Sequence, residues 1–561
     1  MKEKRKLKKN VKIFVFIIVC LIISFILGYK FLFKEKDTVI NTSYAASETL
    51  EIPLYDLEYK EALNIKRGTK LTVYKFKEKR EDKIYVKVKY NDKFYMINED
   101  DLTTNKDGIV KEKELYVRTP LTVYKDDVSS KILSHIAKGE KLDIIGYDKI
   151  DESGVVNKYK IKYNDTIGYV YGKYLVKTQD EASLYYNENG ILEYMNKMGD
   201  TLGGGTASKL DYYPYEKPKF EDNVMPDEVR ALYLNSAVVS NIDEYISFAK
   251  ENNINALVID IKDNTSPAYN SNIMKEYSPT NYAKALNSFE DYKAYIKKAK
   301  DAGLYLIGRI TTFKDSYFVE DHKEVAISSR DGAPFSHNGS YWPSAYNRYV
   351  WEFSVELAKE AVSEIGFNEI QFDYVRFPDR TTALENSGTI NLNNTYNESK
   401  AEALQGFVMY ATDELHALNA YVSIDVFGES ASDYVTAYGQ FWPAISNIAD
   451  AISGMPYPDH FNAHEYGISE VVWTVPYKLL SAWGKTVADK QKQIPTPASV
   501  RTWIQAYDSV KEPSVAYDAS KVSDEIKALY DNGLTGGYMT WNSGSNIYKY
   551  KQISGAFKKE Y

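Results

Sequence analysis

The chain has 561 residues, of which 26% are charged, and a formal net charge of −8 that is spread thinly along the sequence. This acidic balance argues against nucleic acid as the main partner, because phosphate backbones are bound by basic surfaces. The single cysteine, Cys20, excludes a disulfide within the chain, and a chain of this length can bury hydrophobic cores without one.

The amino terminus combines a basic tail, residues 1–12, with an apolar run. The tail carries seven Lys or Arg residues, and the 17 residues Ile13–Tyr29 carry no charge. A membrane-spanning helix needs about 17–25 such residues, and the adjacent KFLF extends the run if Lys30 snorkels. We therefore predict one transmembrane anchor over residues 13–33. More positive charge precedes the run than follows it, which predicts a single-pass protein of the cell membrane with a cytoplasmic amino terminus and an extracellular bulk. A cleaved signal peptide is the alternative, but the Ala-rich candidate site at 43–46 lies well beyond the apolar run.

Two β-rich segments follow the anchor. The sequence LTVYK occurs at 71–75 and again at 121–125, and alternating strands with an Asn-Asp turn follow each copy. The alternation predicts hairpins, and the match predicts tandem copies of one unit. We place one small β-barrel over 50–104 and a second over 112–177. The second resembles bacterial Src homology 3-like domains in YVRTPLTVY, AKGEKLDIIG and GYVYGKYL, which implies a wall-binding or spacer role. The first copy lacks the arginine motif and the final Gly-Tyr-Val.

Residues 178–228 are predicted to form a linker, because they combine three consecutive glycines with Pro, Tyr and mixed charge. Strand–helix alternation then runs over residues 229–555. The predicted strands are 230–234, 256–262, 304–310, 369–375, 421–427, 451–457, 501–507 and 536–542. Eight strands with helix candidates between them predict an α/β fold, a (β/α)₈ TIM barrel preceded by two small all-β barrel domains and a transmembrane helix. The rival, a doubly wound open sheet, would usually show a Gly-rich phosphate loop after its first strand, and none follows Leu234.

Polar residues collect at the predicted carboxyl ends of these strands, where a TIM barrel carries its chemistry. The segment EIQFDYVRFP, 369–378, delivers a carboxylate, a tyrosine and a guanidinium just before Pro378. Because side chains alternate along a strand, Asp260 and Lys262 are expected to share one face. The candidate substrate-binding residues are Asp260, Lys262, Arg309, Tyr374, Arg376, Tyr457, Gln505, Trp541 and Asn542.

Two carboxylates on adjacent strands are what glycosidic bond cleavage requires, one as acid and one as nucleophile or base. The candidates are Asp373 on the fourth strand and Asp425 on the fifth. Asp373 is predicted to be the ionised partner because Arg376 is near it in sequence. Asp425 is then the acid, with Glu429 as its substitute if the fifth strand ends early. Tyr374, Tyr457, Trp503 and Trp541 could stack on sugar rings.

Other chemistries have weaker support in the sequence. His460 and His464 are spaced i, i+4, but the Glu of the metalloprotease motif is absent between them. There is no Gly-x-Ser-x-Gly elbow at a strand end and no Walker loop. We therefore predict no metal and no cofactor.

The motifs ALVIDIKD, LYLIGRITTFKD, NEIQFDYVRFP, VSIDVFG, MPYPDHF, RTWIQAY and YMTWN occur in this order. Together they closely resemble the putative glycoside hydrolase domain family, a domain of unknown function related to TIM-barrel glycosidases, over about 228–550. The resemblance implies a barrel that cleaves a polysaccharide or a peptidoglycan-type polymer. Gln505 stands on the seventh strand, where many retaining glycosidases carry their nucleophile, so an α-amylase-like arrangement on strands four and five is the better analogy. The alternative is a non-catalytic carbohydrate-binding surface scaffold.

Overall fold

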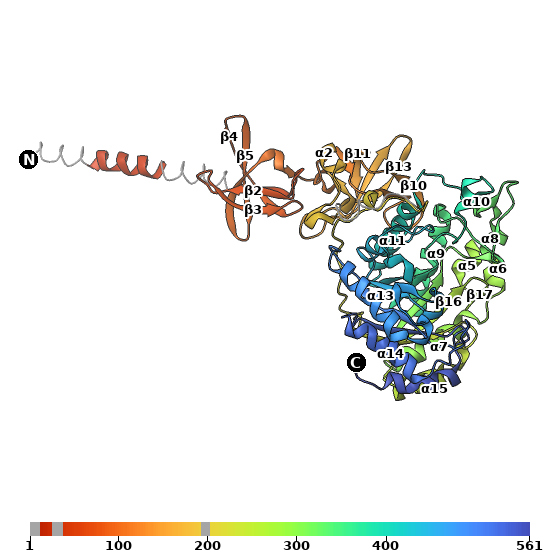
Figure 1. Cartoon of the computed structure of the whole chain (residues 1–561). Coiled ribbons are helices and arrows are strands. Elements are labelled where there is room, and N and C mark those ends of the chain that lie inside the picture. The colour runs from red at the N-terminus through yellow and green to blue at the C-terminus, as the bar shows by residue number, and fades with distance from the viewer. Residues whose placement is uncertain (1–11, 25–37, 192–201) are drawn as a thin grey trace, which may run out of the picture. The chain divides into compact units, whose positions relative to one another are not determined.

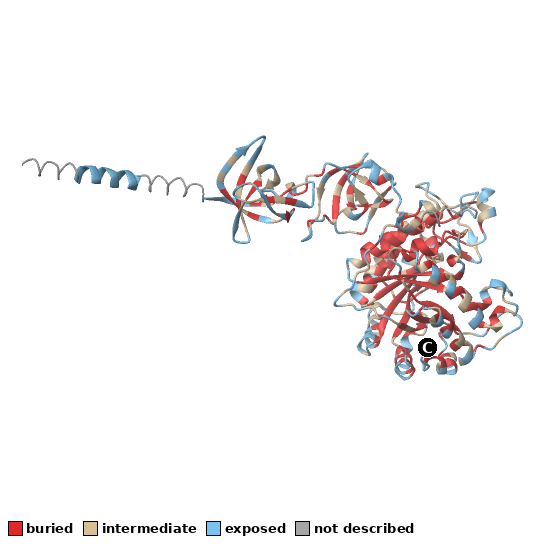
Figure 2. Cartoon of the chain, turned by 60° about the vertical axis from the view of Figure 1, so that its left-hand side comes forward, coloured by how far each residue is buried: buried red, intermediate tan, exposed pale blue. Residues whose placement is uncertain are grey.

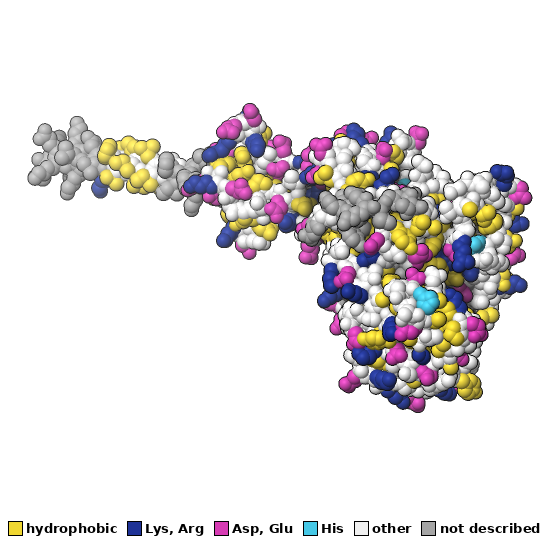
Figure 3. Space-filling view, in the orientation of Figure 1, with side chains coloured by type: hydrophobic (Ala, Val, Ile, Leu, Met, Phe, Trp, Pro, Cys, Tyr) yellow, Lys and Arg dark blue, Asp and Glu magenta, His cyan; other side chains and the backbone are white. Residues whose placement is uncertain are grey.

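The computed structural model describes residues 12–24, 38–191 and 202–561. Residues 12–24 are helical, and their apolar side chains are yellow in Figure 3. The rest of the predicted anchor, 25–33, lies outside the described residues. Among the helices that the structure describes, none has both the length and the apolar character needed to cross a bilayer. The chain divides into two compact units (Figure 1): one extends to Ser183 without Ser130–His135, and the other contains Ser130–His135 and Leu184–Tyr561.

The β-rich segment over residues 39–176 forms two antiparallel seven-stranded sheets with the same strand order. The first sheet runs β3-β2-β6-β5-β4-β1-β7 and the second β10-β9-β13-β12-β11-β8-β14. The strands of the first are β1 (Val39–Ala45), β2 (Glu51–Tyr55), β3 (Glu61–Lys66), β4 (Lys70–Arg80), β5 (Lys83–Tyr90), β6 (Lys93–Asn98) and β7 (Leu102–Thr103). Those of the second are β8 (Glu114–Val117), β9 (Leu121–Tyr124), β10 (Ile132–Ile136), β11 (Lys141–Tyr147), β12 (Lys158–Tyr163), β13 (Thr166–Tyr171) and β14 (Leu175–Val176). The prediction of two all-β segments before the α/β region is confirmed.

The tandem repeat is real, but only one of the two sequence matches that suggested it joins equivalent strands. KVKYND and KIKYND end β5 and β12, which hold the same place in the two sheets, whereas the two copies of LTVYK do not correspond. The first LTVYK lies in β4, the fourth strand of its sheet, whereas the second begins in β9, the second strand of its sheet. The equivalent turns are those that precede β4 and β11. Gly68 has a φ of +85° and Gly139 a φ of +88°. Each glycine N–H donates to the last residue of the first strand of its sheet, Gly68 to Ala45 and Gly139 to Val117. Glycine is favoured at both turns because a left-handed backbone costs other residues free energy.

The second unit is built on a nearly closed barrel of parallel strands. In chain order these are β15 (Val229–Leu234), β16 (Ala256–Asp263), β18 (Tyr305–Thr311), β22 (Glu369–Asp373), β24 (Tyr421–Phe427), β25 (Ala451–Met455), β26 (Ser499–Val500), β27 (Thr502–Gln505) and β28 (Gly537–Trp541). β15 pairs with both β16 and β28. The seventh strand position is divided, because β26 pairs with β25 whereas β27 pairs with β28. The predicted α/β barrel is thus confirmed as a nearly closed parallel barrel.

Helices surround these strands, and Figure 2 shows buried strands enclosed by helices with exposed outer faces. The longer helices are α4 (Ile242–Glu251), α7 (Phe289–Asp301), α9 (Arg348–Glu360), α11 (Lys400–His416), α13 (Pro476–Gln491), α14 (Ala519–Asp531) and α15 (Ile547–Phe557). Shorter helices of this unit are α5 (Asn272–Tyr277), α6 (Pro279–Ala283), α8 (Ser316–Asp321), α10 (Thr382–Asn386) and α12 (Trp442–Ser446), whereas α2 (Gln179–Ser183) follows β14 in the first unit. Short strands β17 (Ser266–Pro267), β19 (Ser328–Ser329), β20 (Ser336–His337), β21 (Ser340–Tyr341) and β23 (Ile390–Asn391) lie in the loops. Strands covered on both faces read as continuous apolar runs, as in β16 and β18.

Residues 202–228, predicted to belong to a linker, are instead packed on the barrel. We call this segment the strap. Leu210 and Tyr212 are buried in a cluster with α11 and α12 residues. The backbone N–H of Asp211 donates to Gln405 Oε1 at 2.8 Å. Lys217 Nζ donates to the carbonyl of Ala449 at 2.5 Å. Composition suggested a linker, but the tyrosines of this segment are core residues rather than solvated ones.

Candidate active site

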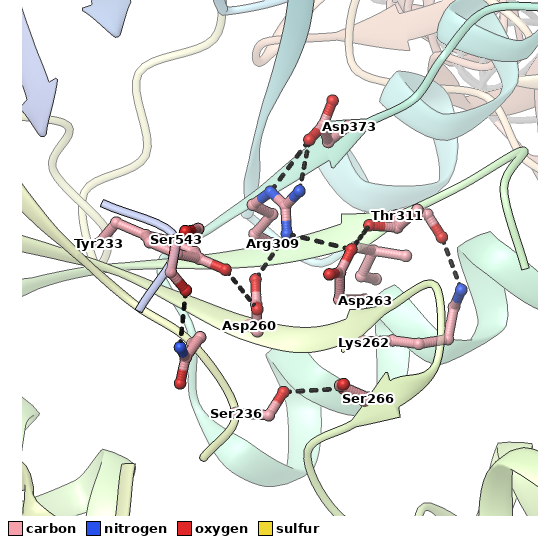
Figure 4. A network of polar contacts seen from close by, with 12 residues as sticks. Tyr233, Ser236, Asp260, Lys262, Asp263, Ser266, Arg309, Thr311, Asp373 and Ser543 are labelled. Atoms are coloured by element: carbon pink, nitrogen blue, oxygen red, sulfur yellow. Dashed lines mark hydrogen bonds and ion pairs between the residues drawn. The ribbon is translucent and has the colours of Figure 1, made fainter. Parts of the chain in front are cut away.

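Arg309 is the centre of the polar network at the carboxyl ends of β16, β18 and β22 (Figure 4). Its Nη1 donates to Asp260 Oδ1 at 2.7 Å, and its Nη2 donates to Asp373 Oδ2 at 2.5 Å. The Tyr233 hydroxyl donates to Asp260 Oδ2 at 2.6 Å. Arg309, Asp260 and Asp373 are all buried. Three strands therefore place one guanidinium between two carboxylates.

A β-bulge at Ile261 decides which residues of β16 reach this network. Asp260 pairs with Arg309, but Lys262 pairs with Ile310, so β16 advances two residues where β18 advances one. Lys262 consequently faces away from the barrel interior and is held by Asp315 at 2.8 Å. The expectation that Asp260 and Lys262 share a face is wrong, because alternation is interrupted at a bulge. Lys262 is fully buried and contacts none of the described carboxylates on the barrel strands, and it joins the network only through the carbonyl of Thr311, to which its Nζ donates at 2.6 Å (Figure 4).

The same bulge turns the Asp263 side chain towards the network. Its Oδ1 accepts a hydrogen bond from Thr311 Oγ1 at 2.7 Å and lies 3.7 Å from Arg309 Nη1. Burial favours a higher pKa for Asp263, but Arg309 and Thr311 hold that pKa below its ordinary value. Burial raises the pKa of Asp260 to about 6 despite Arg309. Neighbouring carboxylates on one strand thus shift in opposite directions.

Asp373 is fixed through both of its oxygens. Oδ2 takes two hydrogen bonds from Arg309, and Oδ1 accepts one from the backbone N–H of Tyr374 at 2.6 Å. Tyr374 has a φ of +54°, a left-handed conformation that costs a non-glycine residue about 1–2 kcal/mol. Its carbonyl accepts from Phe313 N–H, so the turn is bonded to the end of the preceding strand. Strain of this kind is found disproportionately at functional sites.

Asp425 lies on the next strand in a more apolar environment. The register pairs Thr311 with Asp373 and Phe372 with Ile424, so Asp373 and Asp425 are at the ends of neighbouring strands. Trp503 Nε1 donates to Asp425 Oδ1 at 2.8 Å, and Oδ2 is buried with no partner among the described residues. Burial, and then the charge of Asp373, raise the pKa of Asp425 well above its ordinary value. The pair is therefore asymmetric: Asp373 is held by a cation and Asp425 favours its neutral form.

Aromatic side chains lie around the pair. Trp541 is tilted against Tyr233 at 4.5 Å between centroids and lies edge-on to Trp503 at 5.6 Å. Tyr457 stacks with Trp541 at 6.5 Å. Burial raises the pKa of Tyr457, and the charges of Asp425 and Asp373 raise it further. The structure therefore brings predicted Tyr457 and Trp541 to the carboxylates.

Two predicted charged residues have other partners. Arg376 does not contact Asp373, because its Nη1 donates to the carbonyl of Phe377 at 3.0 Å and to Asp379 at 3.3 Å. The turn at Tyr374 carries Arg376 away, and Arg309 takes the place that sequence proximity suggested for it. Glu429 is exposed and accepts hydrogen bonds from the hydroxyls of Tyr434 and Tyr438.

Two predicted amides brace loops. Gln505 Nε2 donates to the carbonyl of Tyr507 at 3.2 Å, and its backbone N–H donates to Glu525 on α14 at 3.0 Å. Asn542 Nδ2 donates to the carbonyl of Ala506 at 2.8 Å. Both side chains are buried and bonded to the loop that follows β27.

Tyr233 and Asp263 are network residues that the sequence prediction did not include. A tyrosine near the end of an otherwise apolar first strand was the available signal for Tyr233. Asp263 has no such signal, because its orientation depends on the bulge. Within the described residues, no group of three or more His, Cys, Asp or Glu side chains is placed to hold a metal ion.

Residues 231–548 match the model of the family described as a putative glycosyl hydrolase domain. No curated protein matches the sequence. A hypothetical protein from Ruminiclostridium thermocellum ATCC 27405 is 31% identical over 35% of this chain and 97% of its own, with a TM-score of 0.30. The PgaB (BpsB) glycoside hydrolase domain from Bordetella bronchiseptica is 12% identical over 59% of this chain and 98% of its own, with a TM-score of 0.43. A class V chitinase from Pseudomonas fluorescens Pf-5 is 13% identical over 59% of this chain and 100% of its own, with a TM-score of 0.38.

Proposed function

Because the chain belongs, through residues 231–548, to the family of putative glycosyl hydrolase domains, we propose that its barrel hydrolyses O-glycosidic bonds in a cell-wall or surface polysaccharide. The observation that carries this proposal is the asymmetric pair of Asp373 and Asp425. Glycosidic cleavage needs one carboxylic acid that keeps its proton and one carboxylate that does not. The two environments differ in the required direction.

Asp425 is proposed as the general acid. Its carboxyl is buried, and the charge of Asp373 further raises its pKa, so the group can keep a proton for the leaving oxygen. Trp503 holds Oδ1, which leaves Oδ2 as the oxygen available to donate. The Trp503 indole thereby orients the acid.

Asp373 is proposed as the nucleophile or the base. Arg309 Nη2 lies 2.5 Å from one oxygen of this carboxylate, and the Tyr374 N–H fixes its second oxygen. A carboxylate held in this way needs little reorganisation when the sugar arrives. Trp541, which is only partly buried, supplies an aromatic face on which a sugar ring can stack, whereas Tyr457 is buried and supports Trp541 from the core.

The proposal extends to the location of the protein. The basic tail and the uncharged run Ile13–Tyr29 support a single-pass membrane anchor with the barrel outside the cell. The two seven-stranded modules would then act as wall-binding or spacer domains between anchor and barrel. Their shared strand order supports a common role for the two.

The test is the release of new reducing ends from a panel of wall and surface polysaccharides. Asp373→Asn and Asp425→Asn keep the side-chain shape, and each should lower cleavage at least about 100-fold because it removes the proton transfer or the charge. Asp301→Asn, an exposed carboxylate on α7, is the matched control and should cleave like the parent. If both barrel variants keep the parent rate, the assignment is wrong.

A non-catalytic carbohydrate-binding scaffold is the second candidate. It is favoured by the burial of both carboxyls, with Asp373 6% and Asp425 1% exposed, and by the two bonds between Asp373 and Arg309. Polymer binding by the parent without any new reducing ends would replace hydrolysis with this function.

A further inference from the structure

A second group of side chains next to Asp373 consists of three donor groups, an ammonium, a guanidinium and an indole, around one tyrosine ring. We call Lys314, Trp342, Tyr374 and Arg376 the donor cluster. Lys314 Nζ lies 4.8 Å from the centre of the Tyr374 ring, and the Arg376 guanidinium carbon lies 5.0 Å from the same centre. Trp342 packs against Tyr374 with 5.7 Å between ring centroids. Two cations and an indole thus meet around one tyrosine.

The donors of this cluster are largely unused by the protein. Lys314 Nζ makes one long contact, 3.5 Å to the Tyr374 hydroxyl, and has no carboxylate within 4.0 Å among the described residues. Both hydrogen bonds that the structure gives Arg376 leave from Nη1. Trp342 is 3% exposed, and its Nε1 has no partner among the residues that the structure describes. A buried N–H without an acceptor costs free energy unless a ligand supplies one.

The donor cluster carries two positive charges, on Lys314 and Arg376, whereas the adjacent Asp373 is already paired with Arg309. Among the residues that the structure describes, Asp379 is the one carboxylate within 4.0 Å of Arg376, at 3.3 Å, and it occupies the Nη1 side of the guanidinium. Lys314 adds a charge that this carboxylate does not reach within ion-pair distance. Aromatic rings also hold Arg376, with Phe427 at 4.5 Å and Trp342 at 4.9 Å. The guanidinium is therefore fixed in position with its remaining donors uncommitted.

We propose that the donor cluster binds an anionic group on the polymer, so that the substrate class is an acidic polysaccharide carrying carboxylates or phosphodiesters. Ammonium, guanidinium and indole groups donate and do not accept, and charge-assisted bonds to such anions are the strong ones. The cluster adjoins the carboxylate pair, because Tyr374 follows Asp373 and donates its N–H to it. The anionic sugar would therefore lie beside the bond that is cleaved. This inference rests on the proposed hydrolase function for the meaning of that site, but its binding test does not.

The experiment measures binding of the full chain to three polymers: polygalacturonate, poly(glycerol phosphate) and a neutral hydroxyethylcellulose. The parent should prefer at least one anionic polymer, and the preference should weaken as salt rises. Lys314→Met removes the charge and keeps most of the side-chain length. It should weaken anionic binding about tenfold, the loss of one charge-assisted bond. The two anionic arms distinguish a carboxylate from a phosphodiester.

Lys250→Met is the matched control, because Lys250 is an exposed lysine of α4. It makes the same change in net charge and should leave binding at the parent level. Arg376→Gln is the second variant, with its unfolding midpoint measured beside the parent's, and should also weaken anionic binding. The proposal is overturned if Lys314→Met binds like Lys250→Met, if the neutral polymer binds as tightly as the anionic ones, or if no anionic polymer binds.

The outcomes separate this inference from the proposed function. Cleavage of a neutral polymer that needs Asp425 but not Lys314 would leave hydrolysis in place and remove the anionic site. Anionic binding that needs Lys314, with no new reducing ends, would keep the site and remove hydrolysis.

Discussion

Arg309 compensates carboxylates from two different strands in a place that solvent hardly reaches. Its guanidinium is 2% exposed and bonds to Asp260 and Asp373. Removing one partner of a buried ion pair leaves an uncompensated charge, which costs more than a surface pair contributes. The electrostatic state of the site is thus set by one side chain.

Arg309→Met should destabilise the barrel by about 3–5 kcal/mol, because Asp260 and Asp373 would be buried without their cation. Chemical unfolding of the full chain, followed by tryptophan fluorescence, measures the change. Lys297→Met breaks the exposed pair with Asp301 on α7 and should cost less than about 1 kcal/mol. Equal effects of the two substitutions would contradict the role given to Arg309.

Glu525 gives the stability of the barrel a pH dependence. It accepts hydrogen bonds from the Gln505 N–H and the Tyr517 hydroxyl, and burial raises its pKa to about 8 from an ordinary value of 4.5. The folded state therefore keeps a proton that the unfolded state loses. This contribution to stability is complete below pH 4.5 and is lost as the pH rises towards 8.

Glu525→Gln cannot ionise, so its unfolding free energy should lack this loss. Between about pH 5 and about pH 8, the parent should fall relative to the variant by up to about 1.4 kcal/mol per pH unit. Unfolding midpoints of both proteins across this range give the difference. Parallel curves would show that Glu525 titrates at its ordinary pKa.

The β16 bulge shows how one element decides the composition of the site. Two residues of β16 oppose one step of β18 at Ile261, which places Asp260 and Asp263 in the network and Lys262 outside it. The Ile261 side chain packs over Gly308 of β18, which pairs with Ile259, and an added Cβ at Gly308 would lie 2.5 Å from Ile261 Cδ1 and 3.1 Å from Phe367. Glycine at 308 is thus required by the packing of the bulge.

Gly308→Ala should destabilise the barrel by about 1–3 kcal/mol, because the new methyl group overlaps Ile261 in a closely packed layer. Gly484→Ala is the matched control in helix α13, where the nearest neighbour of the added Cβ is at 3.5 Å. The control should be neutral or stabilising by about 0.5–1 kcal/mol, since alanine favours helix. Thermal unfolding of both variants checks the contrast, and similar losses would contradict it.

Strands and their order were predictable because each barrel strand is a short apolar run between helical patterns. That order also placed Asp373 and Asp425 on neighbouring strands. The hydrogen-bond partners of these two carboxylates were not predictable in the same way. Whether Arg309 or Arg376 holds Asp373 depends on the turn at Tyr374, whose positive φ has no signature in the sequence. The division of the seventh strand likewise depends on which neighbour each half meets.

The barrel unit begins earlier in the chain than its composition suggests, because it includes the strap. The strap contributes Leu210 and Tyr212 to a cluster with Val435 and Phe441, and Asn223 Nδ2 donates to the carbonyl of Asn368 at 2.7 Å. These contacts make the strap part of the second unit. Acidic and basic side chains are interspersed on the face shown in Figure 3, in agreement with the thinly spread net charge.

A fragment that begins at Leu184 should be soluble and unfold cooperatively, whereas one that begins at Asp222 should expose the apolar surface that the strap covers. Expression of both fragments, compared by solubility and by the sharpness of unfolding, measures the difference. Equal behaviour of the two would mean that the strap adds no stability to the barrel.

The two seven-stranded modules share a strand order but carry the pentapeptide LTVYK in different strands. The first copy lies in β4, and the first four residues of the second copy form β9. Neighbouring modules of one topology can exchange equivalent strands while they fold, a characteristic misassembly of repeat proteins. An exchange guided by LTVYK would put a strand beside the wrong neighbours, whereas one guided by KVKYND and KIKYND, at the ends of the equivalent strands β5 and β12, would keep the native strand order. Any exchange between the two modules is therefore expected at the hairpins that contain β5 and β12, where sequence and topology agree.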